Sequence, residues 1–161
     1  MAGKVMCCSH LKPLLDPVTR KYTIDRCILD LKEHADRFDS IVISGYSMAL
    51  IAPCVADALH KDIILVRKDD EKCHSSYPVE GVLCQRYIII DDLVGSGETI
   101  KRVKTKIGNH FYSGAKLVGI YLYQPQYSAY RTHEKVKEYL GIELLNSPHD
   151  ERMAKKNWND T

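Results

Sequence analysis

The sequence predicts an α/β fold built on a parallel sheet with helices on both faces. Short β-branched runs alternate with amphipathic segments along the chain, at a spacing typical of strand–helix–strand units. One of these runs, Tyr87–Ile90, leads directly into two acids and a small-residue loop at the start of a helix. A length of 161 residues with 45% hydrophobic side chains suits one domain with a real core.

The composition narrows the class of protein. A net charge of +2 is too small to indicate a nucleic acid as partner. No apolar run is long enough to span a bilayer and no N-terminal signal pattern appears, so we expect no membrane partner. The six cysteines form no Cys-x-x-Cys pair, and their spacing suggests neither a metal site nor a disulfide framework. We therefore expect reduced thiols in a cytoplasmic protein.

The first regular element is predicted to be an amphipathic helix over residues 22–38. Thr23 suits its N-cap, and Pro13 and Pro17 should break regular structure ahead of it. Six apolar residues share one face of this helix: Ile24, Cys27, Ile28, Leu31, Ala35 and Phe38.

Four core strands are predicted, over residues 39–44, 62–67, 87–91 and 116–123. After the first strand, a turn leads into a helix over 48–59, whose first turn tolerates Pro53. This helix is so rich in small apolar residues that both of its sides should be buried. The sheet covers one side and a partner subunit is expected to cover the other, which predicts a homodimer.

A long polar loop is predicted over residues 69–85, and loops of this length in a compact domain are often mobile lids. A helix over 97–108 follows the third strand, and Gly108 offers its stop. The region 125–161 contains a short helix over 133–140 and is expected to form a small hood. The whole chain is thus predicted to be one domain, with its core at about 23–124.

The stretch from Arg86 to Thr99 can bind phosphate by a simple mechanism. Its glycines let the backbone approach a ligand closely, and the first amides of the following helix have no intrahelical partners. Ser96 and Thr99 add hydroxyl donors. Asp91 and Asp92 can accept hydrogen bonds from ribose hydroxyls or hold a hydrated Mg²⁺. The loop has no Gly-Lys-Ser/Thr ending, so it is not a P-loop.

This stretch resembles the phosphoribosyl-pyrophosphate (PRPP) motif of the type I phosphoribosyltransferases. That motif has four mainly apolar residues, two acids and a small loop ending in a hydroxyl, which read here as Tyr87–Ile90, Asp91-Asp92 and Leu93–Thr99. The resemblance covers roughly residues 23–124 and is strong at 87–99. It implies Mg²⁺-dependent transfer of phosphoribose from PRPP to a nucleobase, with release of pyrophosphate.

The resemblance also implies roles for residues of three loops above the carboxyl ends of the strands. Asp91 and Asp92 would bind the ribose hydroxyls and the metal. The 5′-phosphate would lie on Gly95, Ser96, Gly97, Glu98 and Thr99. Pyrophosphate would meet the turn after the first core strand, at Gly45, Tyr46 and Ser47. This turn lacks the basic residue or second glycine often found there in the family.

The long loop resembles the catalytic loop of orotate phosphoribosyltransferases, with one extra residue. Lys68, Lys72 and His74 would close over the leaving pyrophosphate and neutralise its charge. The pair Ser76-Tyr77 is also similar to the lid of hypoxanthine phosphoribosyltransferases. The alternative is a solvated loop in which the acids at 69–71 cancel the lysines.

The stretch from Asp91 to Thr99 most resembles the xanthine–guanine branch of the family. Two departures from that branch leave the identity of the acceptor base open. The aspartate that contacts N7 of a purine in that branch is Gly95 here, and the lysine that reads its exocyclic oxygen is Gln124. Three aromatic side chains remain for stacking on a base: Tyr127, Tyr130 and Trp158.

Three readings of the function follow. The first is a phosphoribosyltransferase, the second a PRPP- or nucleotide-binding regulator or an inactive homologue, and the third a transferase that uses the same donor on a non-purine acceptor. The departures at Gly95, at Gln124 and in the pyrophosphate turn favour the second somewhat.

Overall fold

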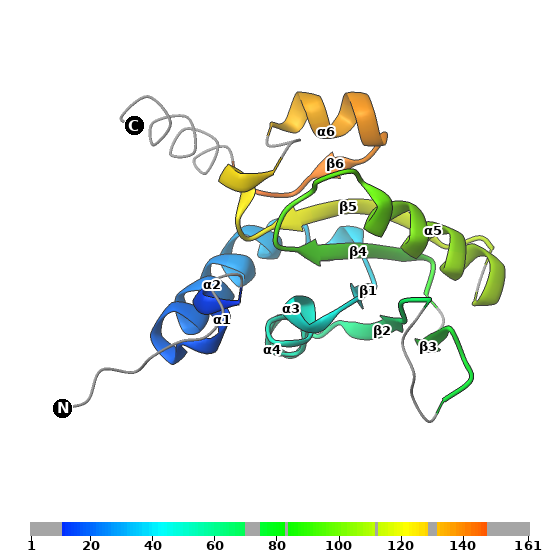
Figure 1. The fold of residues 1–161 in the computed structure, drawn as a ribbon, viewed down its shortest axis with the longest axis horizontal. Helices are drawn as coiled ribbons and strands as arrows, with labels where there is room; N and C mark the ends of the chain where they lie inside the picture. Colours follow the sequence, from blue (N-terminus) through cyan, green and yellow to red (C-terminus); the bar gives the residue numbers. More distant parts are fainter. Residues whose placement is uncertain (1–10, 70–74, 83, 112, 129–131, 148–161) are drawn as a thin grey trace.

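The computed structural model describes residues 11–69, 75–82, 84–111, 113–128 and 132–147 (Figure 1). These residues form a six-stranded sheet in the order β3-β2-β1-β4-β5-β6. Its strands are β1 (Ser40–Ile43), β2 (Asp62–Val66), β3 (Val79–Gly81), β4 (Arg86–Asp91), β5 (Lys116–Leu122) and β6 (Glu143–Leu144). Neighbouring strands pair in parallel except β3, which runs antiparallel to β2. The predicted α/β class is confirmed.

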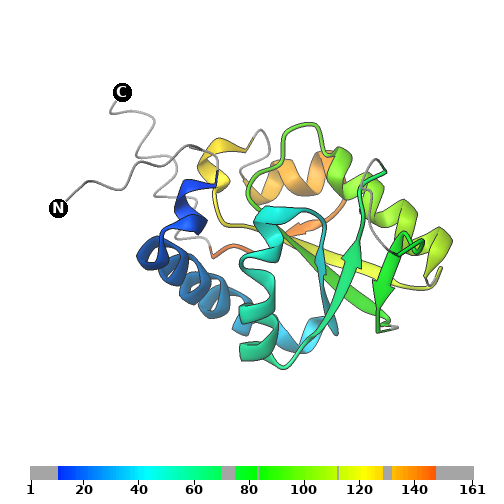
Figure 2. The ribbon, with the colours of Figure 1, turned by 60° about the horizontal axis from the view of Figure 1, so that its bottom comes forward.

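The helices lie on both faces of the sheet. They are α1 (Lys12–Leu15), α2 (Pro17–Lys32), α3 (Tyr46–Ala49), α4 (Ala52–Leu59), α5 (Glu98–His110) and α6 (His133–Leu140), with short 3-10 turns η1 (Ala35–Arg37) and η2 (Pro125–Tyr127). Figure 2 shows α2 and α4 together on one side of the sheet and α5 and α6 on the other. Right-handed crossovers from β1 to β2 and from β4 to β5 run in opposite directions, so their helices must cover opposite faces.

The start of α2 corrects the predicted helix over 22–38. The helix begins at Pro17, and the Asp16 side chain caps it by accepting a hydrogen bond from the Thr19 amide at 2.8 Å. Pro17 occupies the first helical position, where a missing N–H costs nothing, so it starts the helix instead of breaking it. Thr23 lies inside the helix, where its hydroxyl donates to the Thr19 carbonyl oxygen.

The helix predicted over 48–59 is divided into α3 and α4. Pro53 has no N–H to bond the preceding turn, so the regular helix restarts at Ala52. The buried side of α4 packs on β1, β2 and also α2 of the same chain. The cover that we expected from a partner subunit therefore comes at least partly from α2, and the homodimer stays a prediction.

Two further corrections concern the region around the long loop and α5. The loop predicted over 69–85 contains β3, which the sequence analysis missed because a three-residue strand is defined by its pairing with β2. Gly81 allows this pairing, since a Cβ there would lie 2.6 Å from the Ile63 carbonyl oxygen. Gly108 does not stop α5, which continues to His110.

The core consists mainly of the apolar strand residues and the inward faces of the helices. Tyr87, Ile88, Ile89 and Ile90 of β4 are all buried, as the apolar run predicted. The predicted helix over 133–140 is confirmed as α6, and Gly141 ends it in the left-handed conformation with a φ of 65°. Within the part of the chain that the structure describes, no helix combines the length and apolar character needed to cross a membrane.

Candidate functional site

A cavity of about 590 Å³ lies at the carboxyl ends of β1 and β4, the two central strands of the sheet. The crossovers leave these strands in opposite directions, and open α/β sheets bind ligands at such a point. Its lining comes from two segments and three further residues: Ser44–Ser47, Asp91–Ile100, Leu11, Lys68 and Arg102. The sheet thus brings together residues that lie far apart in the sequence.

The turn after β1 forms one wall of the cavity. Gly45 has a φ of 114° and a ψ of 170°, a conformation that side chains rarely adopt. A Cβ at Gly45 would lie 3.6 Å from Cε and 3.8 Å from Nζ of Lys68. The Lys68 side chain therefore lies over the Gly45 backbone, which places a cation beside this turn.

The acid pair at the end of β4 forms the floor. Asp91 and Asp92 are 7% and 9% exposed, so both carboxyl groups are largely removed from water. The Asp92 amide donates to Asp91 Oδ1 at 2.9 Å, and the Leu93 amide donates to Asp92 Oδ1 at 2.8 Å. Burial, followed by the neighbouring Asp92 carboxyl, raises the pKa of Asp91 to about 8. Hydroxyl donors or a cation bound here would favour the charged form.

The loop from Gly95 to Thr99 forms the second wall and leads into α5. Gly97 has a φ of 80° and occupies the N-cap position of the helix. A Cβ there would lie 2.9 Å from Cδ2 of Leu140, so the loop also packs closely against α6. The Glu98 amide donates to Ser96 Oγ at 3.4 Å. Glycines, hydroxyls and the positive end of a 13-residue helix make this wall suitable for an anion.

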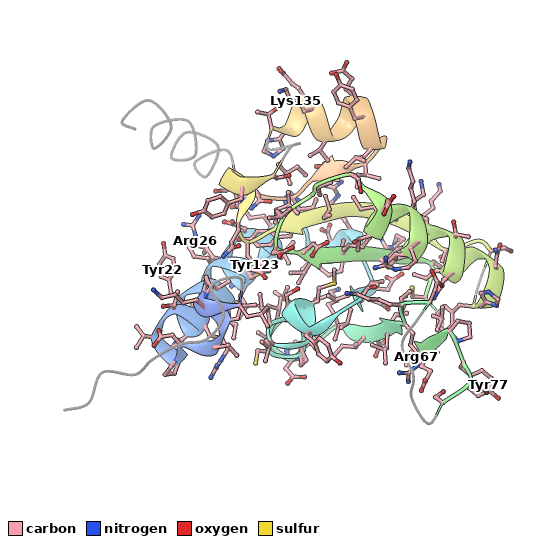
Figure 3. The ribbon with its side chains drawn as sticks, viewed as in Figure 1. Tyr22, Arg26, Arg67, Tyr77, Tyr123 and Lys135 are labelled. Carbon is pink, nitrogen blue, oxygen red and sulfur yellow. The ribbon has the colours of Figure 1, made fainter. Side chains whose placement is uncertain are left out.

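Contacts at the root of the long loop fix the position of Lys68. Lys106 of α5 donates to the Arg67 carbonyl oxygen at 2.6 Å and pairs with Asp69 Oδ1 at 2.7 Å. Arg67 in turn donates from its amide to the Pro78 carbonyl oxygen at 3.0 Å and from Nε to the Tyr77 carbonyl oxygen at 3.2 Å. Figure 3 labels Arg67 and Tyr77 in this region, near β3. Both ends of the loop are thus held against the sheet next to the cavity.

Most of the residues predicted for the site line this one cavity. They are Gly45, Tyr46, Ser47, Lys68, Asp91, Asp92, Gly95, Ser96, Gly97, Glu98 and Thr99. Tyr127, predicted to bind the base, is 68% exposed in η2 and is not among the lining residues. Lys72, His74, Tyr130 and Trp158 lie outside the described residues, and their roles stay predictions.

Two neighbours of the cavity were missed from the sequence. Arg102 of α5 donates from Nη2 to Ser44 Oγ at 3.2 Å. Its position three residues after Thr99 was an available signal, because residues at this spacing share a helix face. Tyr123, labelled in Figure 3, hydrogen-bonds to Ser47, and burial together with the charge of Asp92 raises its pKa. Within the described part of the chain, no group of three or more His, Cys, Asp or Glu side chains is placed to hold a metal ion.

Solved structures of other proteins share the fold of this chain. No protein-family model and no curated protein matches the chain. Orotate phosphoribosyltransferase from Francisella tularensis is similar over 81% of this chain and 66% of that one, with a TM-score of 0.60 at 13% identity. The orotate enzyme from Aeropyrum pernix is similar over 97% of this chain and 85% of that one, with a TM-score of 0.58 at 15% identity.

A third similar structure belongs to a longer protein. The UMP synthase of Leishmania donovani has a TM-score of 0.53 at 22% identity, over 82% of this chain. This chain spans only 29% of that protein. Identities this low show a shared fold, and the functions in these names belong to those proteins.

Proposed function

Because this chain has the fold of the type I phosphoribosyltransferases, we propose that it binds PRPP with Mg²⁺ and transfers the phosphoribosyl group to a nucleobase. The observation that carries the proposal is the meeting of three segments on one cavity: the acid pair, the Gly95–Thr99 loop and the Gly45 turn with Lys68 over it. These segments supply groups for hydroxyls, for a terminal phosphate and for a second anion.

In the proposed reaction the bond from ribose C1 to the pyrophosphate oxygen breaks, a bond from C1 to a base nitrogen forms, and that nitrogen loses its proton. The transition state resembles an oxocarbenium ion, so stabilising it and the departing pyrophosphate matters more than activating a nucleophile. The Gly95–Thr99 loop holds the 5′-phosphate through backbone amides and hydroxyls. The Gly45 turn and Lys68 meet the pyrophosphate, and Asp91 and Asp92 orient the ribose.

The residues at the floor of the cavity fit a magnesium ion. Mg²⁺ prefers oxygen ligands and keeps several waters, so one or two carboxylates and the phosphates of a substrate suffice to bind it. Burial, followed by the neighbouring Asp92 carboxyl, raises the pKa of Asp91 to about 8, and a cation beside the pair would favour the charged form. When bound, the cation would supply positive charge to the diphosphate.

The acceptor remains a proposal at the level of a nucleobase. A Cβ at Gly95 would meet nothing within 4 Å, so the missing aspartate leaves open space there. Lys72 and His74 keep their predicted role at the leaving pyrophosphate, and Trp158 its predicted role at the base. The homodimer and the cytoplasmic location also stay predictions.

The experiment is to measure PRPP-dependent release of pyrophosphate with Mg²⁺ against a panel of purine, pyrimidine and pyridine bases. Release with one base supports the proposal and names the acceptor. The double variant Asp91→Asn with Asp92→Asn should lose PRPP binding and keep its fold. A matched control, Asp57→Asn with Asp62→Asn, removes two exposed carboxyl groups outside the cavity and should leave binding intact. Unchanged PRPP affinity in the first variant would refute the placement of the site.

A PRPP- or nucleotide-binding regulator is the second candidate. It is favoured by Gly95 and Gln124, which replace the two base-reading side chains of the purine branch, and by a pyrophosphate turn without a basic residue. Thermal stabilisation by PRPP without pyrophosphate release from any base would identify this candidate.

A further inference from the structure

Arg102 links the two walls of the cavity. Its backbone belongs to α5, which follows the Gly95–Thr99 loop, whereas its Nη2 donates at 3.2 Å to Ser44 Oγ in the turn after β1. Ser44 is 4% exposed and directly precedes Gly45, so the guanidinium lies at the start of the Gly45 turn. Arg102 also lines the cavity together with Lys68.

Within the described residues, no ion pair neutralises the charge of Arg102. Its Nε is buried and has no hydrogen-bond partner among the described residues. The charge of Arg102 lowers the pKa of two nearby carboxyl groups, those of Asp91 and Asp69, as a minor cause beside stronger ones. A guanidinium has five N–H donors, and Ser44 Oγ accepts one bond from it.

We propose that Arg102 is the second cation of the pyrophosphate subsite at the Gly45 turn, where its guanidinium binds the pyrophosphate group of PRPP beside Lys68. The inference rests on the proposed function and extends it, because the turn itself contains no basic residue. The cations come instead from two other places, the segment that follows β2 and the second turn of α5. The forked donors of arginine match phosphate oxygens better than a single ammonium does.

The subsite is distinct from the Gly95–Thr99 loop, which offers backbone amides and hydroxyls. One wall of the cavity thus binds a phosphate through neutral donors and the other through two cations. Losing Arg102 should therefore weaken pyrophosphate binding much more than binding of a sugar phosphate. A residue that only supported the fold would weaken both.

The test measures dissociation constants for Mg-pyrophosphate and for ribose 5-phosphate separately, by calorimetry on the full chain. Arg102→Gln should raise the dissociation constant of pyrophosphate by about tenfold or more, the worth of a lost charge-assisted bond. The constant for ribose 5-phosphate should stay within about twofold. Lys101→Gln removes a neighbouring exposed cation that does not line the cavity, and it should change neither constant. Arg102→Lys keeps the charge without the fork and should weaken pyrophosphate binding less than Arg102→Gln.

Four outcomes overturn the inference. They are an unchanged pyrophosphate constant in Arg102→Gln, an equal rise of both constants in it, an effect of Lys101→Gln of the same size, and a wild-type chain that binds ribose 5-phosphate but not pyrophosphate. If Arg102→Gln does not fold, Arg102→Lys is compared with Lys101→Gln instead. Equal pyrophosphate constants in these two variants would then overturn the inference. A wild-type chain that binds neither ligand would overturn the proposed function as well, which separates the two failures.

Discussion

The hydroxyl of Ser128 bonds both backbone groups of Val94. Ser128 Oγ accepts from the Val94 amide at 3.1 Å and donates to the Val94 carbonyl oxygen at 3.0 Å. Both residues are buried, so neither backbone group of Val94 has water as an alternative partner. At the end of β5, Asn146 Oδ1 likewise accepts from the Leu122 amide at 2.9 Å, and Asn146 Nδ2 donates to the Leu122 carbonyl oxygen at 2.7 Å. Ser128, which follows β5, thus holds the loop that follows β4, and Asn146 holds the end of β5.

Ser128→Ala should therefore destabilise the site loop as well as the fold. The substitution leaves the buried amide and carbonyl of Val94 unsatisfied, which costs about 1–3 kcal/mol for each group left without a partner. We expect a lower free energy of unfolding and weaker ribose 5-phosphate binding, measured by denaturant titration and calorimetry. Thr105→Ala on the exposed side of α5 is the control, and equal stability of the two variants would contradict the role of Ser128.

Asp91→Asn should stabilise the chain most at alkaline pH. Burial raises the pKa of Asp91 to about 8, whereas an unfolded aspartate has a pKa of about 3.9. Between these values the folded chain retains a proton that the unfolded chain has lost, so the free energy of unfolding falls as pH rises through this window. The loss is at most about 1.4 kcal/mol per pH unit. Asparagine does not titrate and escapes this penalty.

Denaturant titrations of wild type and Asp91→Asn at several pH values, without ligand, check this prediction. The difference in stability should grow from about pH 4 to about pH 8 and stay constant above, as the two pKa values require. A difference that does not change with pH would mean that Asp91 is ionised throughout.

Gly45→Ala should impair both folding and pyrophosphate binding. The φ of 114° is a conformation almost confined to glycine, and imposing it on alanine costs about 1–3 kcal/mol. The added methyl group would also contact the Lys68 side chain. Gly108→Ala is a matched control, because Gly108 lies inside α5 with nothing within 4 Å of a Cβ. That change should stabilise by about 0.5–1 kcal/mol, and thermal melts of both variants should move in opposite directions.

Lys106→Gln should weaken the attachment of the loop root. The Lys106 side chain is 13% exposed, and its bond to the Arg67 carbonyl oxygen is better shielded than its pair with Asp69, whose side chain is 80% exposed. Most of the loss therefore comes from the carbonyl contact, at about 1–3 kcal/mol. We expect faster hydrogen exchange at residues 67–69 and a several-fold weaker pyrophosphate affinity. Lys104→Gln, at an exposed position of the same helix, should show neither effect.

Much of the fold was predictable because its signals are local. The apolar run of β4 predicts a buried strand, and all four of its residues Tyr87–Ile90 are buried. The spacing of Ile100, Val103 and Ile107 predicts the inward face of α5, and each of these side chains is buried. Strand, loop and helix follow one another without interruption here, so the cavity wall at 91–99 could be located from neighbouring residues alone.

Some helix boundaries were predicted wrongly because a proline can either begin or interrupt a helix. One strand was missed because it is defined by pairing with a distant strand. Pro17 can break a helix or begin one, and the Asp16 cap at Thr19 decides for the second. Likewise Pro53 divides one apolar segment into α3 and α4. The strand β3 is defined by its pairing with β2, and a run of three residues is too short to show a strand pattern in the sequence.

By itself the sequence determined the α/β class, the core strands and the phosphate-type loop, since each depends on residues a few positions apart. Only the tertiary structure decided what faces that loop. It brings Lys68 over Gly45 and bonds Arg102 to Ser44, 58 residues away in the chain. Such contacts depend on strand order and on the opposite directions of the two crossovers, and these follow from packing of the whole sheet instead of from any local pattern.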